Sequence, residues 1–442
     1  MSPLTALLWL VPFLTLSAAA SYPAVVNLRN LTGPPQHLAA GILYGLPDPP
    51  RTIPEALLKP LHLTAFRSGG AQIPAPGRGW SVSEAEYLPR FASALHDYQI
   101  ACSLKASFIL LPHDLWGSDG TQDQKATYPG DGGWGAYDKF LARVVRDIKE
   151  AKMQAGLSVD IWNEADLSAF WTRSRERWEE VWVRAYKVLR RDLPGVKITG
   201  PAFAGPPSVM NPWWTGFMAL VKRTGTVPDE WVWHLEGGES SMDASHAGLA
   251  GLLKMYGLPE RPINVDEYGT QVEQTPAGSA WWIGQLERHD ARGLRGNWAM
   301  GRGLRDGAAG LLSAKRDGGY VVGGEWRVYA YYANMTGVRV GTRAGGDGIV
   351  DAYATVDGGR VKVLVGVRKA GMGMGSVRVE GVGSVTGLVE NEIIGVRRLI
   401  FGVEGQPVDL GVVKLSVVGD AVVLEVGKME RNEALAFEMG GI

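Results

Sequence analysis

The sequence is poor in cysteine, in net charge and in long apolar runs. Cys102 is the only cysteine among 442 residues, so no intrachain disulfide can form and a large core must stabilise the fold. The formal net charge is −1, which argues against nucleic-acid binding and against a polybasic membrane protein. The apolar fraction of 45% and the charged fraction of 21% are typical of a soluble globular protein. At this length we expect two domains, one of them large.

An apolar run near the N-terminus, Leu4 to Leu16, is shorter than the ~20 residues that span a bilayer. It is followed by three alanines, Ala18 to Ala20, which match an A-x-A cleavage pattern. We therefore interpret residues 1–20 as a secretory signal peptide, with a signal anchor as the alternative. This interpretation predicts a secreted, extracellular protein with no membrane contact after signal removal. The sequons at Asn30 and Asn334 are compatible with an exported glycoprotein.

Of the 25 prolines, 24 precede residue 277, and Pro407 is the only one in the last third of the chain. Alternating runs such as Val361 to Val367 are separated there by turns rich in glycine and aspartate, which predicts an antiparallel β-sandwich. A strand-like segment around Val26 precedes any helical stretch and needs partners. We therefore expect residues 21–37 to join residues 306–442 in a sandwich domain.

Between these two parts, strand-like and helix-like segments alternate. The expected strands are residues 38–44, 63–67, 102–111, 157–161, 196–199, 231–235, 262–265 and 296–300. Eight strands alternating with helices over about 265 residues predict a (β/α)8 barrel, the TIM barrel, for residues 38–305. An open doubly wound sheet is the alternative, but neither G-x-G-x-x-G nor G-x-x-x-x-G-K-[ST] follows any strand.

Two of the expected strand ends carry a glutamate beside an aromatic residue. Trp162, Asn163 and Glu164 follow the fourth strand, and Glu267 precedes Tyr268 at the end of the seventh. Because the carboxyl ends of parallel strands meet at one face of a barrel, both carboxylates should face one cleft. A lone buried glutamate is more often a structural ion-pair partner. Two carboxylates in one cleft are what glycosidic bond cleavage requires, one as proton donor and the other as nucleophile or base.

These two motifs resemble those of the retaining glycoside hydrolases of clan A. A barrel flanked by a sandwich built from both chain ends is most similar to glycoside hydrolase family 39, the β-xylosidase and α-iduronidase family. The resemblance implies that Glu164 is the acid/base, that Asn163 binds the sugar 2-hydroxyl and that Glu267 is the nucleophile. Ala165 stands where the usual Asn-Glu-Pro motif has proline. The sugar, its linkage and exo or endo action are left open by this resemblance.

Further residues near the expected strand ends are candidate substrate contacts. They are Arg67, His113, Trp116, Trp171, His234, Tyr268 and Trp298. For Arg67 and His113 a structural ion pair is an equal alternative to substrate binding. For His234 the equal alternative is a core histidine whose hydrogen bonds are satisfied within the protein. The tryptophans are candidate platforms because indole rings pack against the C–H faces of sugars, and the resemblance implies that Trp298 floors the sugar site. Glu236 is the chief rival of Glu267 for the nucleophile role.

Metal and cofactor chemistry is not expected. The sequence has no H-E-x-x-H motif, no cysteine pair and no aspartate-rich calcium loop. The expected partner is an oligosaccharide or polysaccharide. A non-catalytic carbohydrate-binding or cell-wall-associated protein on a degenerate barrel is the alternative, although a binder has no need of two closely placed acids. A lyase acting on uronic acids would need a basic side chain with a neighbouring cation, and no such cluster stands out.

Overall fold

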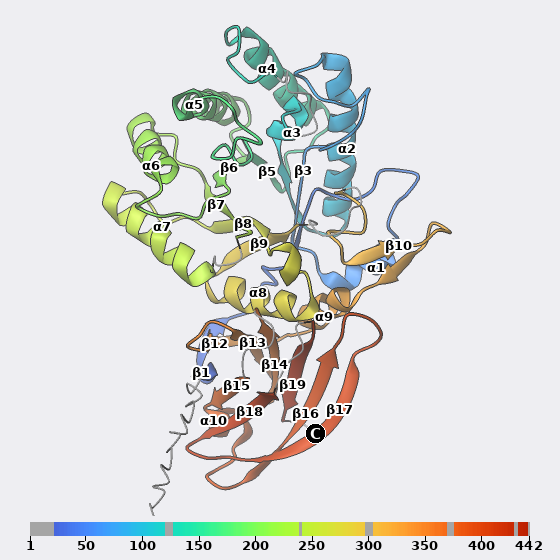
Figure 1. Ribbon diagram of the computed structural model, residues 1–442, viewed down its shortest axis with the longest axis vertical. Coiled ribbons are helices and arrows are strands. Elements are labelled where there is room, and N and C mark those ends of the chain that lie inside the picture. The colour runs from blue at the N-terminus through green and yellow to red at the C-terminus, as the bar shows by residue number, and fades with distance from the viewer. Residues whose placement is uncertain are drawn as a thin grey trace, which may run out of the picture.

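The structure is a computed structural model that describes residues 22–119, 127–237, 241–296, 304–368, 375–427 and 432–440. Figure 1 shows a barrel surrounded by helices and, against one side of it, a separate β-sheet domain. The predicted fold class, a (β/α)8 barrel with an accessory antiparallel β-sandwich, is confirmed. In the part of the chain that the structure describes, no helix has both the length and the apolar character needed to cross a bilayer.

Eight parallel strands close the barrel in sequence order. They are β2 (Gly41–Leu43), β3 (Ala65–Ser68), β4 (Ser107–Leu110), β5 (Leu157–Asp160), β6 (Lys197–Phe203), β7 (Glu230–Leu235), β8 (Ile263–Tyr268) and β9 (Ala291–Arg295). Pairing of β2 with β9 completes the ring. These strands are short and almost wholly buried, as expected of parallel strands that helices cover from outside.

Two strand predictions are wrong in position. The eighth strand was expected at 296–300, but it is β9, which ends at Arg295. Its sequence, Ala-Arg-Gly-Leu-Arg, contains no apolar run that would predict a buried strand. The strand can nevertheless lie in the barrel because its arginines have partners: Arg292 donates to Asn264 and Arg295 donates to Glu325. Trp298 lies outside the described residues. The third strand was expected from residue 102, but the preceding helix continues to Ser103.

Helices surround the barrel and connect its strands. They are α1 (Glu55–Leu58), α2 (Glu84–Ser103), α3 (Pro112–Trp116), α4 (Gly135–Glu150), α5 (Arg175–Asp192), α6 (Pro212–Thr224), α7 (Met242–Tyr256) and α8 (Pro276–Arg288), with short 3₁₀ turns η1 (Lys59–Leu61) and η2 (Gln271–Glu273). Side-chain oxygens start several of them by accepting a backbone N–H of the first turn. Ser83 caps α2, Ser174 caps α5 and Ser241 caps α7 in this way.

The second domain is one nine-stranded sheet in the order β17-β16-β19-β14-β13-β12-β1-β15-β18. Its strands are β1 (Ala24–Gly33), β12 (Val338–Arg343), β13 (Val350–Asp357), β14 (Arg360–Val367), β15 (Gly375–Glu380), β16 (Ile393–Phe401), β17 (Val408–Ser416), β18 (Ala421–Gly427) and β19 (Ala434–Met439), with the short helix α10 (Val382–Thr386). The edge strands β17 and β18 are consecutive in the chain and approach each other at the turn between them, and the domain encloses a valine-rich core. β1 lies inside this sheet, antiparallel to β12 and parallel to β15.

Helix α8 joins the two domains. Its residues from Pro276 to Glu287 are all buried, although a helix on the outside of a barrel normally keeps one face in water. The hairpin β10 (Leu312–Ala314) and β11 (Tyr320–Val322) and helix α9 (Gly324–Ala333) complete the connection. Across the interface Gln285 donates to Asp351 at 2.7 Å, and Arg288 pairs with the same carboxylate. The barrel and the sandwich are therefore packed together rather than strung on a linker.

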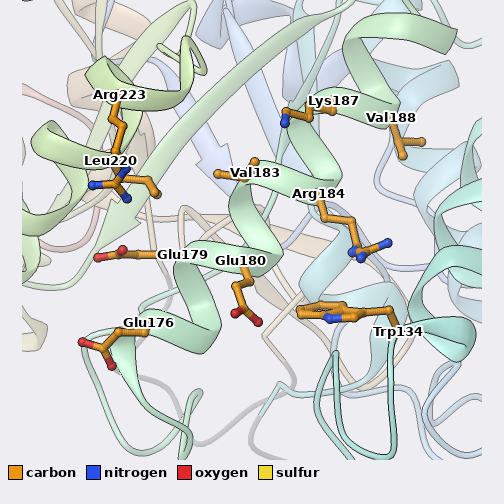
Figure 2. Close-up of a pocket in the computed structure, with 10 residues that line it drawn as sticks. All are labelled: Trp134, Glu176, Glu179, Glu180, Val183, Arg184, Lys187, Val188, Leu220 and Arg223. Atoms are coloured by element: carbon orange, nitrogen blue, oxygen red, sulfur yellow. The ribbon is translucent and has the colours of Figure 1, made fainter.

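A groove of about 770 Å³ lies on the helical surface of the barrel (Figure 2). Residues of α5 and α6 line it together with Trp134, which precedes α4. The Trp134 ring is covered by the guanidinium of Arg184 at 4.6 Å and approached by that of Arg177 at 5.3 Å. The lining comes from helix surfaces and not from strand ends, so this groove is separate from the face where parallel strands place their chemistry.

Candidate active site

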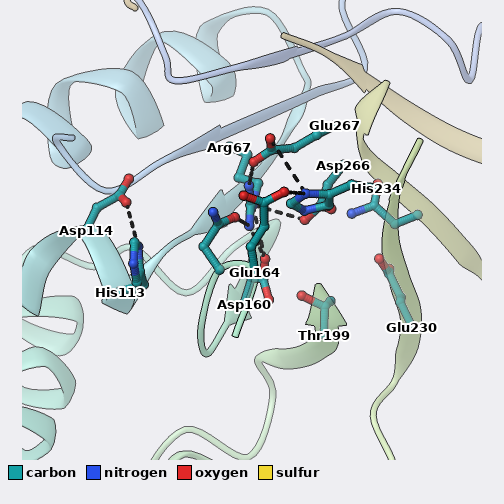
Figure 3. A network of polar contacts seen from close by, with 12 residues as sticks. Arg67, His113, Asp114, Asp160, Glu164, Thr199, Glu230, His234, Asp266 and Glu267 are labelled. Carbon is teal, nitrogen blue, oxygen red and sulfur yellow. Dashed lines mark hydrogen bonds and ion pairs between the residues drawn. The ribbon is translucent and has the colours of Figure 1, made fainter. Parts of the chain in front are cut away.

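Glu164 and Glu267 meet at the carboxyl ends of the barrel strands (Figure 3). Glu164 follows β5, and Glu267 is the last residue but one of β8. A carboxylate oxygen of each, together with a ring nitrogen of His234, lie within 4.8 Å of one another. Glu164 is 6% exposed and Glu267 is 2% exposed. Two carboxylates from strands far apart in sequence therefore share one almost water-free site.

The backbone that presents Glu164 is held in an unusual conformation. Glu164 has φ of 42°, in the left-handed region that residues with a side chain seldom occupy. Its N–H donates to the carbonyl of Ala202 on β6 at 2.9 Å, and Ala202 itself has φ of 55°. Backbone strain of this kind persists where the surrounding structure imposes it and is common at functional sites.

Arg67, at the end of β3, is fully buried and contacts four polar side chains. Its Nη1 donates to Glu267 Oε1 at 2.7 Å, and its Nη2 donates to Asp160 at 2.7 Å and to Asn163 Oδ1 at 2.8 Å. Its Nε lies 2.9 Å from Asp266. Burial alone would lower the pKa of Arg67, but the surrounding carboxylates raise it well above its ordinary value. Arg67 therefore supplies a permanent positive charge in direct contact with Glu267 and Asn163.

His234, on β7, links the two glutamates. Its Nδ1 lies 2.9 Å from Glu164 Oε1 and 3.6 Å from Glu267 Oε2, and its Nε2 lies 3.1 Å from Asp266. Burial works to lower the pKa of His234, but Glu267 and the contacts with Asp266 and Glu164 raise it well above its ordinary value. Since both ring nitrogens face carboxylates, the imidazole carries both protons and a positive charge.

Two aspartates complete the base of the site. Burial raises the pKa of Asp160 well above its usual range. Burial acts in the same direction on Asp266, but Arg67 and His234 outweigh it and leave the pKa of Asp266 lowered. Because the two pKa shifts are opposite, a proton held by this pair resides on Asp160 in preference to Asp266. Asp160 could have been found from the sequence, because a charged residue at the end of an apolar strand needs a buried partner.

Glu236 and Tyr44 stand beside Glu267. Burial, followed by the charge of Glu267, raises the pKa of Glu236 to about 10. Burial, followed by Glu267 and Glu236, raises the pKa of Tyr44 well above its ordinary value. Tyr44 follows β2 with φ of 67°, another residue in the left-handed region. The sequence analysis missed Tyr44, whose only signal was its place after the first strand, just before Gly45.

Among the described contacts, none joins His113, Trp116 or Trp171, the other predicted substrate contacts, to Glu164 or Glu267. His113 lies in α3, pairs with Asp114 at 3.0 Å and packs edge-on against Trp162 at 4.8 Å. Trp116 and Trp171 are 2% and 3% exposed. Trp116 was expected near a strand end as a sugar platform, but its segment folds into α3 and its ring joins the core.

Tyr268 is also part of the core. Its hydroxyl donates to the carbonyl of Ala39 at 2.8 Å and contacts Tyr329. The side chain alternates with Glu267 along β8, so it points to the opposite side of the strand, toward the surrounding helices. The predicted role of Tyr268 in binding substrate is therefore not supported by its position.

Glu164, His234 and Glu267 are close enough to enclose a metal ion, and no other such group occurs among the described residues. A metal there would have to displace the protons by which both ring nitrogens of His234 face carboxylates. The ion pairs of His234 already account for its position. We therefore interpret the cluster as a hydrogen-bonded acid network and assign no metal to it.

Comparison with solved structures places the fold among known ones. The chain is similar to N2152 from Neocallimastix frontalis, with 19% identity over 95% of this chain and 99% of that one and a TM-score of 0.75. It is similar to a GH39 enzyme from Xanthomonas axonopodis pv. citri, with 14% identity over 98% and 100% and a TM-score of 0.60. A GH39 β-xylosidase from Caulobacter crescentus gives 17% identity over 95% and 99% and a TM-score of 0.56.

No family model matches the sequence, and no curated protein matches it. At identities below 20%, the similarity to solved structures shows a shared fold over nearly the whole chain. GH39 enzymes are among the proteins with this fold, as the sequence motifs indicated. A shared fold does not determine activity, which depends on the residues of the site.

Proposed function

We propose that this protein is a glycoside hydrolase that cleaves O-glycosidic bonds with retention of configuration. The observation that carries the proposal is the approach of Glu164 and Glu267 oxygens to within 4.8 Å at the strand ends. Carboxyl groups ~5–5.5 Å apart are typical of retaining enzymes, whereas inverting enzymes need ~6.5–9.5 Å to hold a water molecule between acid and base. An approach of 4.8 Å or less between carboxylate oxygens is on the retaining side of this division and supports the proposal.

In this proposal Glu267 is the nucleophile. Arg67 donates to its Oε1 at 2.7 Å, and His234 lies 3.6 Å from its Oε2. Burial raises the pKa of Glu267, and these two cations oppose that rise. They therefore keep the carboxylate available to attack the anomeric carbon. The carbon–oxygen bond to the leaving group breaks as the bond to Glu267 forms.

Glu164 is the acid/base in the same scheme. Its proton passes to the departing glycosidic oxygen in the first step, and it takes a proton from water in the second, when water releases the sugar from Glu267. His234 lies 2.9 Å from Glu164 and 3.6 Å from Glu267, so one imidazole orients both carboxyl groups. We expect a bell-shaped pH profile whose two limbs belong to the cluster and not to single residues.

Asn163 is the proposed ligand of the sugar 2-hydroxyl. Its Oδ1 accepts from Arg67 at 2.8 Å, which orients the side chain and turns its amide NH2 away from the guanidinium. That NH2 group can donate to a sugar hydroxyl beside Glu164.

We further propose that the protein is exported, with residues 1–20 as signal peptide. Asn30 and Asn334 are both exposed, as glycosylation of their sequons would require.

The test is hydrolysis of a panel of aryl glycosides by the purified protein, followed by proton NMR of the first sugar released. Aryl β-xylosides come first, because a β-xylosidase is among the proteins of this fold. Retained anomeric configuration is expected. Inverted product would exclude double displacement. Saturable binding of oligosaccharides without hydrolysis would instead favour the non-catalytic carbohydrate-binding alternative.

A further inference from the structure

A third carboxyl group lies within the proposed catalytic site. Glu236 directly follows β7, two residues beyond His234, and its side chain forms a hydrogen bond with Glu267. Its Oε1 is buried and has no hydrogen-bond partner among the described atoms. Its place at a strand end also made Glu236 the chief rival of Glu267 as nucleophile in the sequence. The contact with Glu267 gives it a different role.

Two carboxyl groups in hydrogen-bond contact cannot both be ionised. An ionised carboxylate has only acceptor atoms, so a hydrogen bond between two of them requires one proton. Like charges at this distance in a buried site strongly disfavour the second ionisation. Arg67 donates to Glu267, and this ion pair favours the charged form of Glu267 over that of Glu236. The shared proton therefore belongs to Glu236.

The groups that face Glu236 come from four elements and agree with this assignment. Glu267 on β8 and Glu164 after β5 disfavour its ionisation, whereas His234 on β7 favours it. Tyr44 after β2 is also close enough to interact with Glu236. Together with burial, the two glutamates outweigh the single imidazolium, and the pKa of Glu236 rises to about 10.

We propose that Glu236 is a neutral carboxylic acid in the resting protein, that it donates its proton to Glu267 and thereby positions the nucleophilic carboxylate, and that its ionisation sets an upper pH limit on turnover. The last two parts rest on the proposed function. No covalent bond changes in this step. Above the limit Glu236 loses a proton to solvent, the hydrogen bond to Glu267 is lost, and a negative charge appears beside the nucleophile.

The first test does not depend on activity. Infrared difference spectra of the full-length protein between pH 5 and pH 10 report the C=O stretch of protonated carboxyl groups. A protonated carboxyl signal that is lost only at alkaline pH is expected in the wild type and should be missing from Glu236→Gln. Asp160 contributes to both spectra and cancels between them. Glu180→Gln, on the exposed surface of α5, is the matched control and should leave the signal in place.

Thermal unfolding supplies a second readout with a defined sign. Because the folded-state pKa of Glu236 is raised above its value in the unfolded chain, its contribution to stability is complete below pH ~4.5 and is lost as the pH rises. Glu236→Gln lacks this loss. The melting temperature of the variant relative to wild type should therefore increase steadily between pH 5 and pH 9. The Glu180→Gln control should show no such trend.

Kinetics separate a positioning role from a purely structural one. With an activated aryl glycoside, Glu236→Ala should lose about 10- to 100-fold in kcat/KM, as expected for removal of a hydrogen bond to a charged group. Glu236→Gln should recover part of this loss, since its amide still donates, and its alkaline limb should move to higher pH. Equal pH profiles for wild type and Glu236→Gln would overturn the proposed pH limit.

The two proposals fail differently. If the infrared signal and the pH trend in melting temperature are the same in wild type and Glu236→Gln, Glu236 is ionised and the present inference is wrong, whether or not glycosides are hydrolysed. If both signals change as expected but no glycoside is cleaved, the proton assignment of Glu236 stands. In that case the proposed hydrolase activity, and the role of Glu236 in it, are wrong.

Discussion

At the scale of single residues, Arg67 determines the charge balance of the site. One buried guanidinium contacts Glu267, Asp160, Asn163 and Asp266 within 3 Å. Removing one partner of a buried ion pair leaves an uncompensated charge, which costs far more than the pair is worth as a whole. Without Arg67, His234 would be the one cation left beside these carboxylates among the described contacts, and a single imidazolium cannot neutralise all of them.

Substitution of Arg67 should therefore reduce both stability and activity. We expect Arg67→Met to lower the free energy of unfolding by about 3–5 kcal/mol, measured by urea denaturation. Arg184→Met is the matched control, because Arg184 pairs with Asp138 at the surface, where such pairs contribute at most about 1 kcal/mol. Equal losses in the two variants would contradict the central role of Arg67.

The two glutamates should respond differently to substitution. In the proposed mechanism Glu267→Ala removes the covalent step, so turnover should stay low for every leaving group. Glu164→Ala should lose about 10²–10⁴-fold on substrates with poor leaving groups, yet keep the first step on activated aryl glycosides. Added azide should then release a glycosyl azide of retained configuration from Glu164→Ala. Retained azide product from Glu267→Ala and none from Glu164→Ala would show that the two roles are exchanged.

At the scale of elements, the sequence predicted the strand ends better than the loops. The sequence predicted that Glu164 and Glu267 lie at strand ends, because an apolar run that ends at a carboxylate can be read directly from the order of the residues. Trp116 was misplaced because its burial depends on α3 and on rings from α4, which no local pattern reveals. β9 was shifted because its two arginines hide the apolar signal, and their partners Asn264 and Glu325 lie elsewhere in the chain.

The contact between α8 and β14 offers a test of the domain interface. A Cβ added to Gly366 would overlap the backbone nitrogen of Trp281 and the carbonyl oxygen of Ala277 on α8. We expect Gly366→Ala to lower the free energy of unfolding by about 1–3 kcal/mol, as overpacking typically does. Gly135→Ala is the control, because its Cβ meets no atom within 4 Å. Equal stability of both variants would mean that the two domains are less tightly packed than described.

At the scale of the whole molecule, the buried helix α8 makes the two domains mutually dependent. No tryptophan occurs after Trp326, so intrinsic fluorescence reports the barrel and its interface, whereas far-UV circular dichroism also reports the sandwich strands. We expect the two signals to give the same thermal midpoint, because coincident transitions indicate one cooperative unit. Two resolved transitions, with fluorescence changing in only one, would indicate independent domains.

The position of β1 has a consequence for synthesis on the ribosome. Val25 pairs with Arg343, and Val26 pairs with Val379. The partner strands of β1 are therefore synthesised more than 300 residues after β1 itself. At about 5–20 residues per second this delay lasts about 15–70 s. Meanwhile the barrel strands emerge in spatial order and can pair with neighbours already made. Nascent chains stopped before residue 338 should therefore carry an unpaired, apolar β1, and we expect these truncated chains to need chaperones although their barrel sequence is complete.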